Sequence, residues 1–112
     1  MSANEYFDLE DAAKRLNGDK SILKMLINMF LDGKDIPLLE TALNEREYKT
    51  AEEYSHAIKG IAGNLSLTLL FDVVTRLNHE LKQGKPSDQT IEEYYSAVRG
   101  TTETLRSVLT TL

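Results

Sequence analysis

Apolar residues recur along most of the chain at the three- and four-residue spacing that is typical of amphipathic helices. No segment shows the alternation of apolar and polar residues that indicates strands joined by hairpin turns. Leu9, Ala12, Ala13 and Leu16 predict a short first helix, and we expect Gly18 to end it, because glycine adopts a left-handed conformation easily. The pattern therefore predicts an all-α protein.

A longer helix is expected to follow, with Asp19 as its N-terminal cap. Its apolar side is formed by Ile22, Leu23, Leu26, Met29 and Phe30 and continues through Ile36, Leu39 and Leu43. Gly33 and Pro37 interrupt this pattern, and a proline removes one hydrogen bond from a helix. We therefore expect one long, kinked helix over about 19–44, and a break near Gly33 is the alternative.

Three further helices are expected in the rest of the chain, at about Glu47–Leu65, at about Thr68–Gln83, and from Ser87 or Asp88 onwards. The apolar positions of the last helix are Ile91, Tyr94, Tyr95, Val98, Leu105, Val108, Leu109 and Leu112. Short connections between amphipathic helices favour antiparallel neighbours. The expected fold is an antiparallel up-down four-helix bundle with a short extra N-terminal helix.

The composition fits a single small domain and restricts its chemistry. The chain has 112 residues, so we expect one domain over 1–112 with its core at about 8–110. It contains no cysteine and two histidines, so thiolate chemistry is excluded and a multi-histidine metal site within one chain is not expected. The formal net charge of −5 does not favour a nucleic-acid partner.

The pattern gives no sign of a membrane association. No apolar run approaches the length of about 18 residues that a membrane span requires. The first ten residues are acidic and lack the basic-then-apolar order of a secretory signal. We therefore expect a cytoplasmic protein, and the single apolar stripe on each helix favours a monomer.

One face of the helix expected at 47–65 has an unusual composition. On a helical wheel, Ile58 lies in an apolar stripe with Ala51, Tyr54, Ile61, Ala62 and Leu65. His56, Gly60 and Gly63 fall about 140–160° away from Ile58, which directs all three to solvent. Each glycine inside a helix costs about 1 kcal/mol relative to alanine. We infer that something outside the chain needs the lack of side chains beside His56.

The same face suits the acceptance of a phosphoryl group. His56, Lys59, Gly60 and Gly63 have the spacing of neighbours on one helix surface. A neutral imidazole has a free nitrogen lone pair and acts as a nucleophile. Lys59 would offer a positive charge to the phosphate, and the two glycines would let a partner approach closely.

The remaining requirements of phosphoryl transfer would be met partly outside the chain. Glu52 or Glu53, on the preceding turn, is expected to hold the proton of the other ring nitrogen. Phosphoryl transfer normally needs a metal ion, yet no carboxylate cluster near His56 suggests a magnesium site. The chain would therefore be a phosphoryl carrier without a cofactor of its own, and it would not be an enzyme.

The segment His56-Ala57-Ile58-Lys59-Gly60-Ile61-Ala62-Gly63-Asn64-Leu65 resembles the signature of histidine-containing phosphotransfer (HPt) domains. That signature reads His-x-x-Lys-Gly-x-small-x-x-aliphatic. Gly18-Asp19 and the apolar residues after it are similar to the family's second helix, and Glu47-Tyr48 is similar to the start of its histidine helix. The resemblance covers about 8–110 and departs at Ser66, where many members have glycine.

The resemblance implies that His56 accepts a phosphoryl group from an aspartyl phosphate of a response-regulator receiver domain and passes it to another receiver. Lys59 and Gly60 would flank the phosphorylated ring. The receiver would supply the aspartate and the Mg²⁺. A hybrid sensor histidine kinase is a further expected partner, and the chain would be either a whole protein or a domain of such a kinase. The receiver contact surface would include Glu53, Gly63 and Asn64.

The sequence allows two other interpretations. The segment Asn78-His79-Glu80-Leu81-Lys82 is similar to the dimerisation-helix motif of sensor histidine kinases, but the proline of that motif comes too late, at Pro86. Too few residues follow for an ATP-binding domain, so we interpret His79 as a surface residue. The alternative function is a non-catalytic helical module that binds receivers or other partners through the face of His56.

Overall fold

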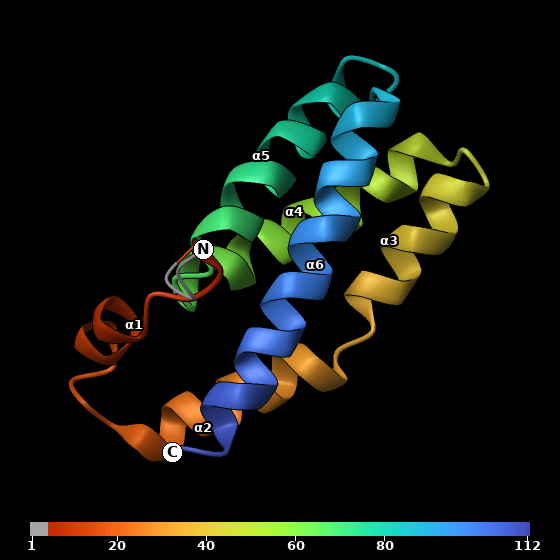
Figure 1. Cartoon of the computed structure of the whole chain (residues 1–112). Helices are drawn as coiled ribbons and strands as arrows, with labels where there is room; N and C mark the ends of the chain where they lie inside the picture. The colour runs from red at the N-terminus through yellow and green to blue at the C-terminus, as the bar shows by residue number, and fades with distance from the viewer. Residues whose placement is uncertain (1–4) are drawn as a thin grey trace.

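A computed structural model describes residues 5–112, and every regular element in this part of the chain is a helix. The expected all-α class is therefore confirmed. The helices are α1 (Leu9–Arg15), α2 (Lys20–Asp32), α3 (Asp35–Asn44), α4 (Tyr48–Asn64), α5 (Thr68–Lys82) and α6 (Asp88–Leu109). They form an elongated body of 40 × 26 × 20 Å, along which the long α6 runs (Figure 1). None of the described helices is both long and apolar enough to cross a membrane.

The segment expected to form one long, kinked helix forms two helices instead. The single helix over 19–44 is therefore a wrong prediction, and the alternative break near Gly33 is confirmed. α2 ends at Asp32, and a Cβ on Gly33 would lie 2.9 Å from the carbonyl oxygen of Met29, which is too close for a side chain. Pro37 then falls in the first turn of α3, where its missing N–H removes no helical hydrogen bond.

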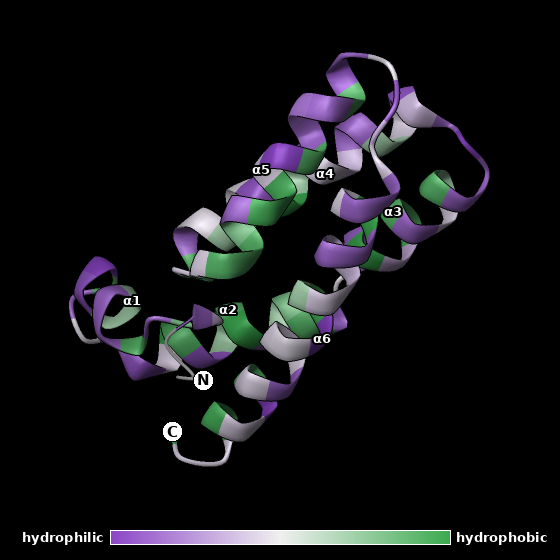
Figure 2. Ribbon diagram, turned by 45° about the horizontal axis from the view of Figure 1, so that its top comes forward, coloured by the Kyte–Doolittle hydropathy of each residue, from purple (hydrophilic) through white to green (hydrophobic). Residues whose placement is uncertain are grey.

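The helices pack around one apolar core. α4 packs against α3 and α5, α5 packs against α6, and α6 also contacts α2. Figure 2 shows that apolar and polar residues are segregated to different sides of the helices, as expected for amphipathic segments. The largest fully buried side chains are Tyr94, Leu23, Ile27, Leu39, Ile58, Leu65, Leu67, Leu70, Leu77, Leu105, Val74 and Thr101.

The apolar side expected for the second helix is only partly buried. Leu23, Ile27 and Phe30 lie in the core, whereas Ile22 and Met29 are 39% and 61% exposed. Apolar residues therefore occupy more than one side of α2, and the expectation that Ile22 and Met29 share one apolar side with Leu23 and Phe30 was wrong. This leaves α2 with an apolar surface that faces outwards.

Residues 6–11 contact two other parts of the fold, the end of α4 and the middle of α6. The backbone N–H of Asp8 donates to the carbonyl oxygen of Ser66 at 3.0 Å, and the Ser66 hydroxyl donates to Asp11 Oδ2 at 2.5 Å. Tyr6 packs onto α6 at Gly100, where a Cβ would overlap the tyrosine ring. Residues 6–11 are thus fixed to the end of α4 and to the middle of α6.

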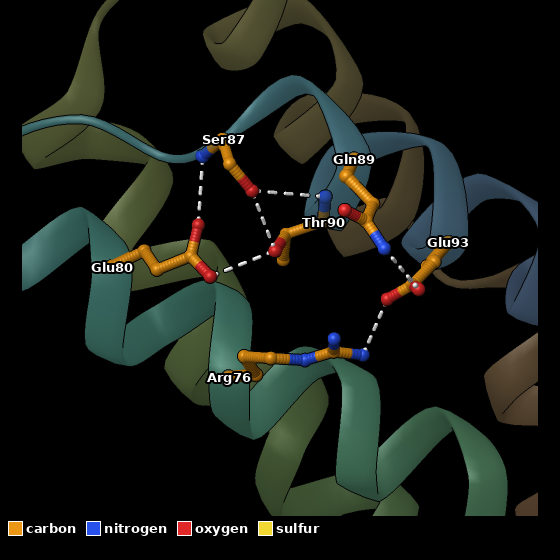
Figure 3. A network of polar contacts seen from close by, with 6 residues as sticks. All are labelled: Arg76, Glu80, Ser87, Gln89, Thr90 and Glu93. Carbon is orange, nitrogen blue, oxygen red and sulfur yellow. Dashed lines mark hydrogen bonds and ion pairs between the residues drawn. The ribbon is translucent and has the colours of Figure 1, made fainter.

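Glu80 fixes the connection between α5 and α6 (Figure 3). Its carboxylate accepts hydrogen bonds from the Ser87 N–H and the Thr90 hydroxyl, both at 2.7 Å. Ser87 in turn caps α6 by accepting from the Thr90 N–H at 3.1 Å, and Arg76 pairs with Glu93 at 2.6 Å. Burial opposes the ionisation of Glu80, but these hydrogen bonds and the Arg76 charge outweigh it and lower the pKa of the carboxyl.

Candidate functional site

α4 carries the candidate residues on the side that faces away from the core. Its buried side consists of Ala51, Ser55, Ile58 and Ala62, which face the neighbouring helices. The helix continues without interruption through Gly60 and Gly63 to Asn64. Burial of one side between α3 and α5 holds α4 helical although two glycines weaken it.

His56 is exposed, and Lys59 is half-buried one turn further along α4. Within residues 5–112, no hydrogen bond or ion pair involves the His56 ring or the Lys59 ammonium group. Both groups are therefore open to an incoming anion. The carboxylates of Glu52 and Glu53 do not bond to His56 either, so the expected orienting contact is not formed in this structure. Glu53 is exposed, one turn before His56.

Gly60 leaves open space beside His56, as its position on the wheel predicts. A Cβ at Gly60 would meet no heavy atom of another element within 4 Å. No close approach among residues 5–112 therefore requires glycine here, although the residue weakens the helix by about 1 kcal/mol relative to alanine. The bare backbone leaves room for a second molecule beside the imidazole.

Gly63 has a different environment, and the expectation that it faces open solvent is wrong. A Cβ there would lie 3.4 Å from Cε2 and 3.6 Å from Cδ2 of Phe71, which belongs to α5. Gly63 is consequently half-buried, while the Phe71 ring stays 39% exposed. On this flank of α4, the neighbouring surface is therefore formed by the partly exposed ring of Phe71. The wheel missed this because Phe71 comes from another helix.

The opposite flank of α4 is an apolar hollow of about 250 Å³ between α4, α2 and α3. Met29, Phe30 and Ile36 contribute to its walls from α2 and α3, and Ile61 and Asn64 contribute from α4. Asn64, which the resemblance places in a partner contact, is exposed at the edge of this hollow. The hollow was not predicted from the sequence, because the pattern of one helix does not show that Met29 of α2 lies beside Ile61 and Asn64 of α4.

A buried polar cluster lies behind the exposed face. The Asn78 side-chain amide donates to Ser55 Oγ at 2.8 Å and to the carbonyl oxygen of Glu52 at 3.1 Å. The Ser55 hydroxyl donates to the same carbonyl at 2.9 Å. His79, the neighbour of Asn78, is exposed, as expected. The sequence does contain a signal for Asn78, because this polar residue occupies a position on the side of α5 that is otherwise apolar.

The described residues contain no group of three or more histidine, cysteine, aspartate or glutamate side chains placed to hold a metal ion. Comparison of the chain with protein-family models, with curated proteins and with solved structures finds no match. The similarity to HPt domains thus rests on the chain's own residues, above all on the segment from His56 to Leu65.

Proposed function

We propose that the protein is a histidine phosphotransfer protein, or a domain of one, in which His56 is the phosphoacceptor. One observation carries this proposal. The exposed His56 imidazole lies one turn from the Lys59 ammonium group and beside bare backbone at Gly60, and neither group has a partner among the residues that the structure describes. An imidazole supplies the nucleophile, Lys59 supplies a charge for the phosphate, and Gly60 supplies room for the donor.

In the proposed reaction, a nitrogen of the neutral His56 ring attacks the phosphorus of an aspartyl phosphate on a response-regulator receiver domain. The N–P bond forms while the P–O bond to the aspartate breaks, and the carboxylate leaves with the electron pair. The proton on the other ring nitrogen stays on the ring until water accepts it. The attack of a second receiver's aspartate on the phosphohistidine reverses these changes. Mg²⁺ held by the receiver would neutralise charge during transfer.

The proposal includes the antiparallel up-down four-helix bundle, with α1 as the extra N-terminal helix. If α2 and α3 are counted as one position, the contacts α3–α4, α4–α5, α5–α6 and α6–α2 close a ring of four positions. Such a bundle would support α4 on both flanks and leave its outer face for a partner. A monomeric state, a cytoplasmic location and a hybrid sensor histidine kinase as a second partner belong to the same proposal.

The two histidines of the chain provide the test and its matched control. The wild type, His56→Gln and His79→Gln are incubated with a panel of phosphorylated receiver domains, and acid-labile, alkali-stable label on the chain is measured. We expect label on the wild type and on His79→Gln, and none on His56→Gln, with the same helical circular dichroism for all three. Equal labelling of His56→Gln would refute the site. Binding of a receiver without labelling of any variant would favour the non-catalytic module instead.

A further inference from the structure

The turn of α4 that carries His56 is hydrogen-bonded to α5 inside the core. Asn78 is 3% exposed and Ser55 is fully buried. The Asn78 amide at 3.1 Å and the Ser55 hydroxyl at 2.9 Å both donate to the carbonyl oxygen of Glu52. In an α-helix the carbonyl of residue 52 is also the acceptor for the backbone N–H of residue 56. The polar cluster therefore acts on the helical turn that connects Glu52 to His56.

The Asn78 amide contributes more to the orientation of α4 against α5 than to the stability of the fold. Buried neighbours of Asn78 on the helix are apolar, among them Val74, Leu77 and Leu81. An apolar residue of similar shape would satisfy the packing. Loss of the amide would still leave the Glu52 carbonyl with a side-chain donor, because the Ser55 hydroxyl donates to it. Hydrogen bonds to a fixed backbone oxygen instead select one rotation of α4 against α5 and one register along it.

This rotation matters because a receiver that docks over His56 would meet residues of several helices. His56 belongs to α4, whereas Phe71 on one flank belongs to α5 and Met29 on the other belongs to α2. A receiver that rests on both flanks meets the imidazole only if α4 is oriented correctly between them. A displacement of about 1 Å at a reacting group can lower a rate about 100-fold.

We propose that Asn78 is a positioning residue for phosphotransfer at His56. Through Ser55 and the Glu52 carbonyl it fixes α4 against α5, so that His56 faces the phosphoryl group of a docked receiver. The proposal rests on the proposed function of His56. Asn78 touches no reacting atom and no partner, so its replacement lowers the maximal rate of transfer and leaves the affinity for the receiver unchanged.

The test measures initial rates of label transfer from one phosphorylated receiver over a range of receiver concentrations. Asn78→Leu removes both amide donors at nearly constant volume, and we expect its maximal rate to fall about tenfold. The half-saturating receiver concentration stays within about twofold of the wild type. Val73→Ala is the control, because it also removes buried contacts of α5 but donates no hydrogen bond to α4. We expect Val73→Ala to keep the wild-type maximal rate below its unfolding temperature.

Ser55→Ala gives an independent answer if Asn78→Leu does not fold. It removes one of the two side-chain donors to the Glu52 carbonyl, while the Asn78 amide keeps the other, so we expect a smaller fall in the maximal rate. A wild-type maximal rate in both variants, or a change confined to half-saturation, overturns the positioning role and leaves the proposed function standing. A wild type that no receiver labels overturns the proposed function itself.

Discussion

Gly60 lowers the stability of α4 and leaves open space on its surface beside His56. A side chain at this position has open space around it, so an alanine would lose nothing by collision and would favour the helix by about 1 kcal/mol. We expect Gly60→Ala to be more stable than the wild type by about this amount in chemical denaturation. A longer side chain would fill the space beside His56, so Gly60→Gln should be folded and should accept phosphate much more slowly than Gly60→Ala. Equal labelling rates of the two variants would show that the donor does not need this space.

Ser66 combines an unfavourable backbone conformation with a favourable side-chain contact. It follows α4 with a φ of 57°, where a residue with a Cβ costs about 1–2 kcal/mol, and its hydroxyl donates to Asp11. Ser66→Ala and Ser66→Gly both lose that hydrogen bond, but only alanine keeps a Cβ in the left-handed conformation. We expect Ser66→Gly to be more stable than Ser66→Ala by about 1 kcal/mol in denaturant titrations. The opposite order would mean that Ser66 is not left-handed in solution.

At the scale of elements, the packing of Tyr6 on α6 requires a glycine at position 100. A Cβ on Gly100 would overlap the ring of Tyr6, so Gly100→Ala must displace the tyrosine ring. In a Tyr6→Ala background this collision is absent, and Gly100→Ala should stabilise α6 by about 1 kcal/mol through helix propensity alone. The measurement is a double-mutant cycle of free energies of unfolding. Equal effects of Gly100→Ala in both backgrounds would contradict the packing of Tyr6 on α6.

The contact between α5 and α6 should make stability depend on acidic pH. The pKa of Glu80 is lowered from its ordinary value of 4.5, because hydrogen bonds from Ser87 and Thr90 and the charge of Arg76 outweigh the opposing effect of burial. A lowered pKa stabilises the fold above the unfolded pKa, and this stabilisation is lost as the pH falls through the folded pKa. Glu80→Gln should therefore reduce the fall of unfolding free energy between about pH 5 and pH 3.

The exposed Glu92 of α6 offers the control for this measurement. Glu92→Gln removes the same charge without touching the connection between the helices, so the pH dependence of its stability should follow the wild type. Titrations of unfolding free energy against pH for the three proteins decide the matter. A Glu80→Gln curve parallel to the wild type would show that the carboxylate is not held by Ser87 and Thr90.

The sequence was sufficient to locate the ends of α4 and α5. The expected helices at 47–65 and 68–83 agree with α4 and α5 within one residue at each end, since polar, glycine and proline residues mark those ends. The sequence did not decide the break at Gly33, because a periodic apolar pattern does not show that Gly33 leaves the helical conformation for an extended one. The position of His56 on an exposed face followed from periodicity alone.

The parts of the candidate site that the sequence did not predict involve contacts between helices. Phe71 covers Gly63 from α5, Asn78 binds the turn before His56 from α5, and Met29 lines a hollow together with residues of α4. A helical wheel describes one helix at a time, so it cannot show which neighbour lies beside a given residue. In this protein the exposure of His56 was predictable from the sequence, whereas its surroundings required the packing of the whole molecule.

At the scale of the whole molecule, a substitution in the apolar hollow beside α4 should distinguish the proposed binding of a receiver from the proposed phosphoryl transfer. Met29 lines the hollow and is 61% exposed, so Met29→Glu places a charge where we expect the receiver to bury apolar surface, without disturbing the core. We expect the half-saturating receiver concentration to rise about tenfold, or about 1.4 kcal/mol in binding, while the maximal rate of transfer stays unchanged. Asn78→Leu should show the converse.

Met25→Glu is the matched control, because Met25 is 53% exposed on the same helix but does not line the hollow. Both variants change the formal net charge from −5 to −6, since each adds one carboxylate, so long-range repulsion of an acidic partner is the same in the two proteins. A selective effect of Met29→Glu would therefore locate the contact in the hollow between α2, α3 and α4. An equal loss of affinity in the two variants would attribute the effect to charge and would remove the hollow from the docking surface.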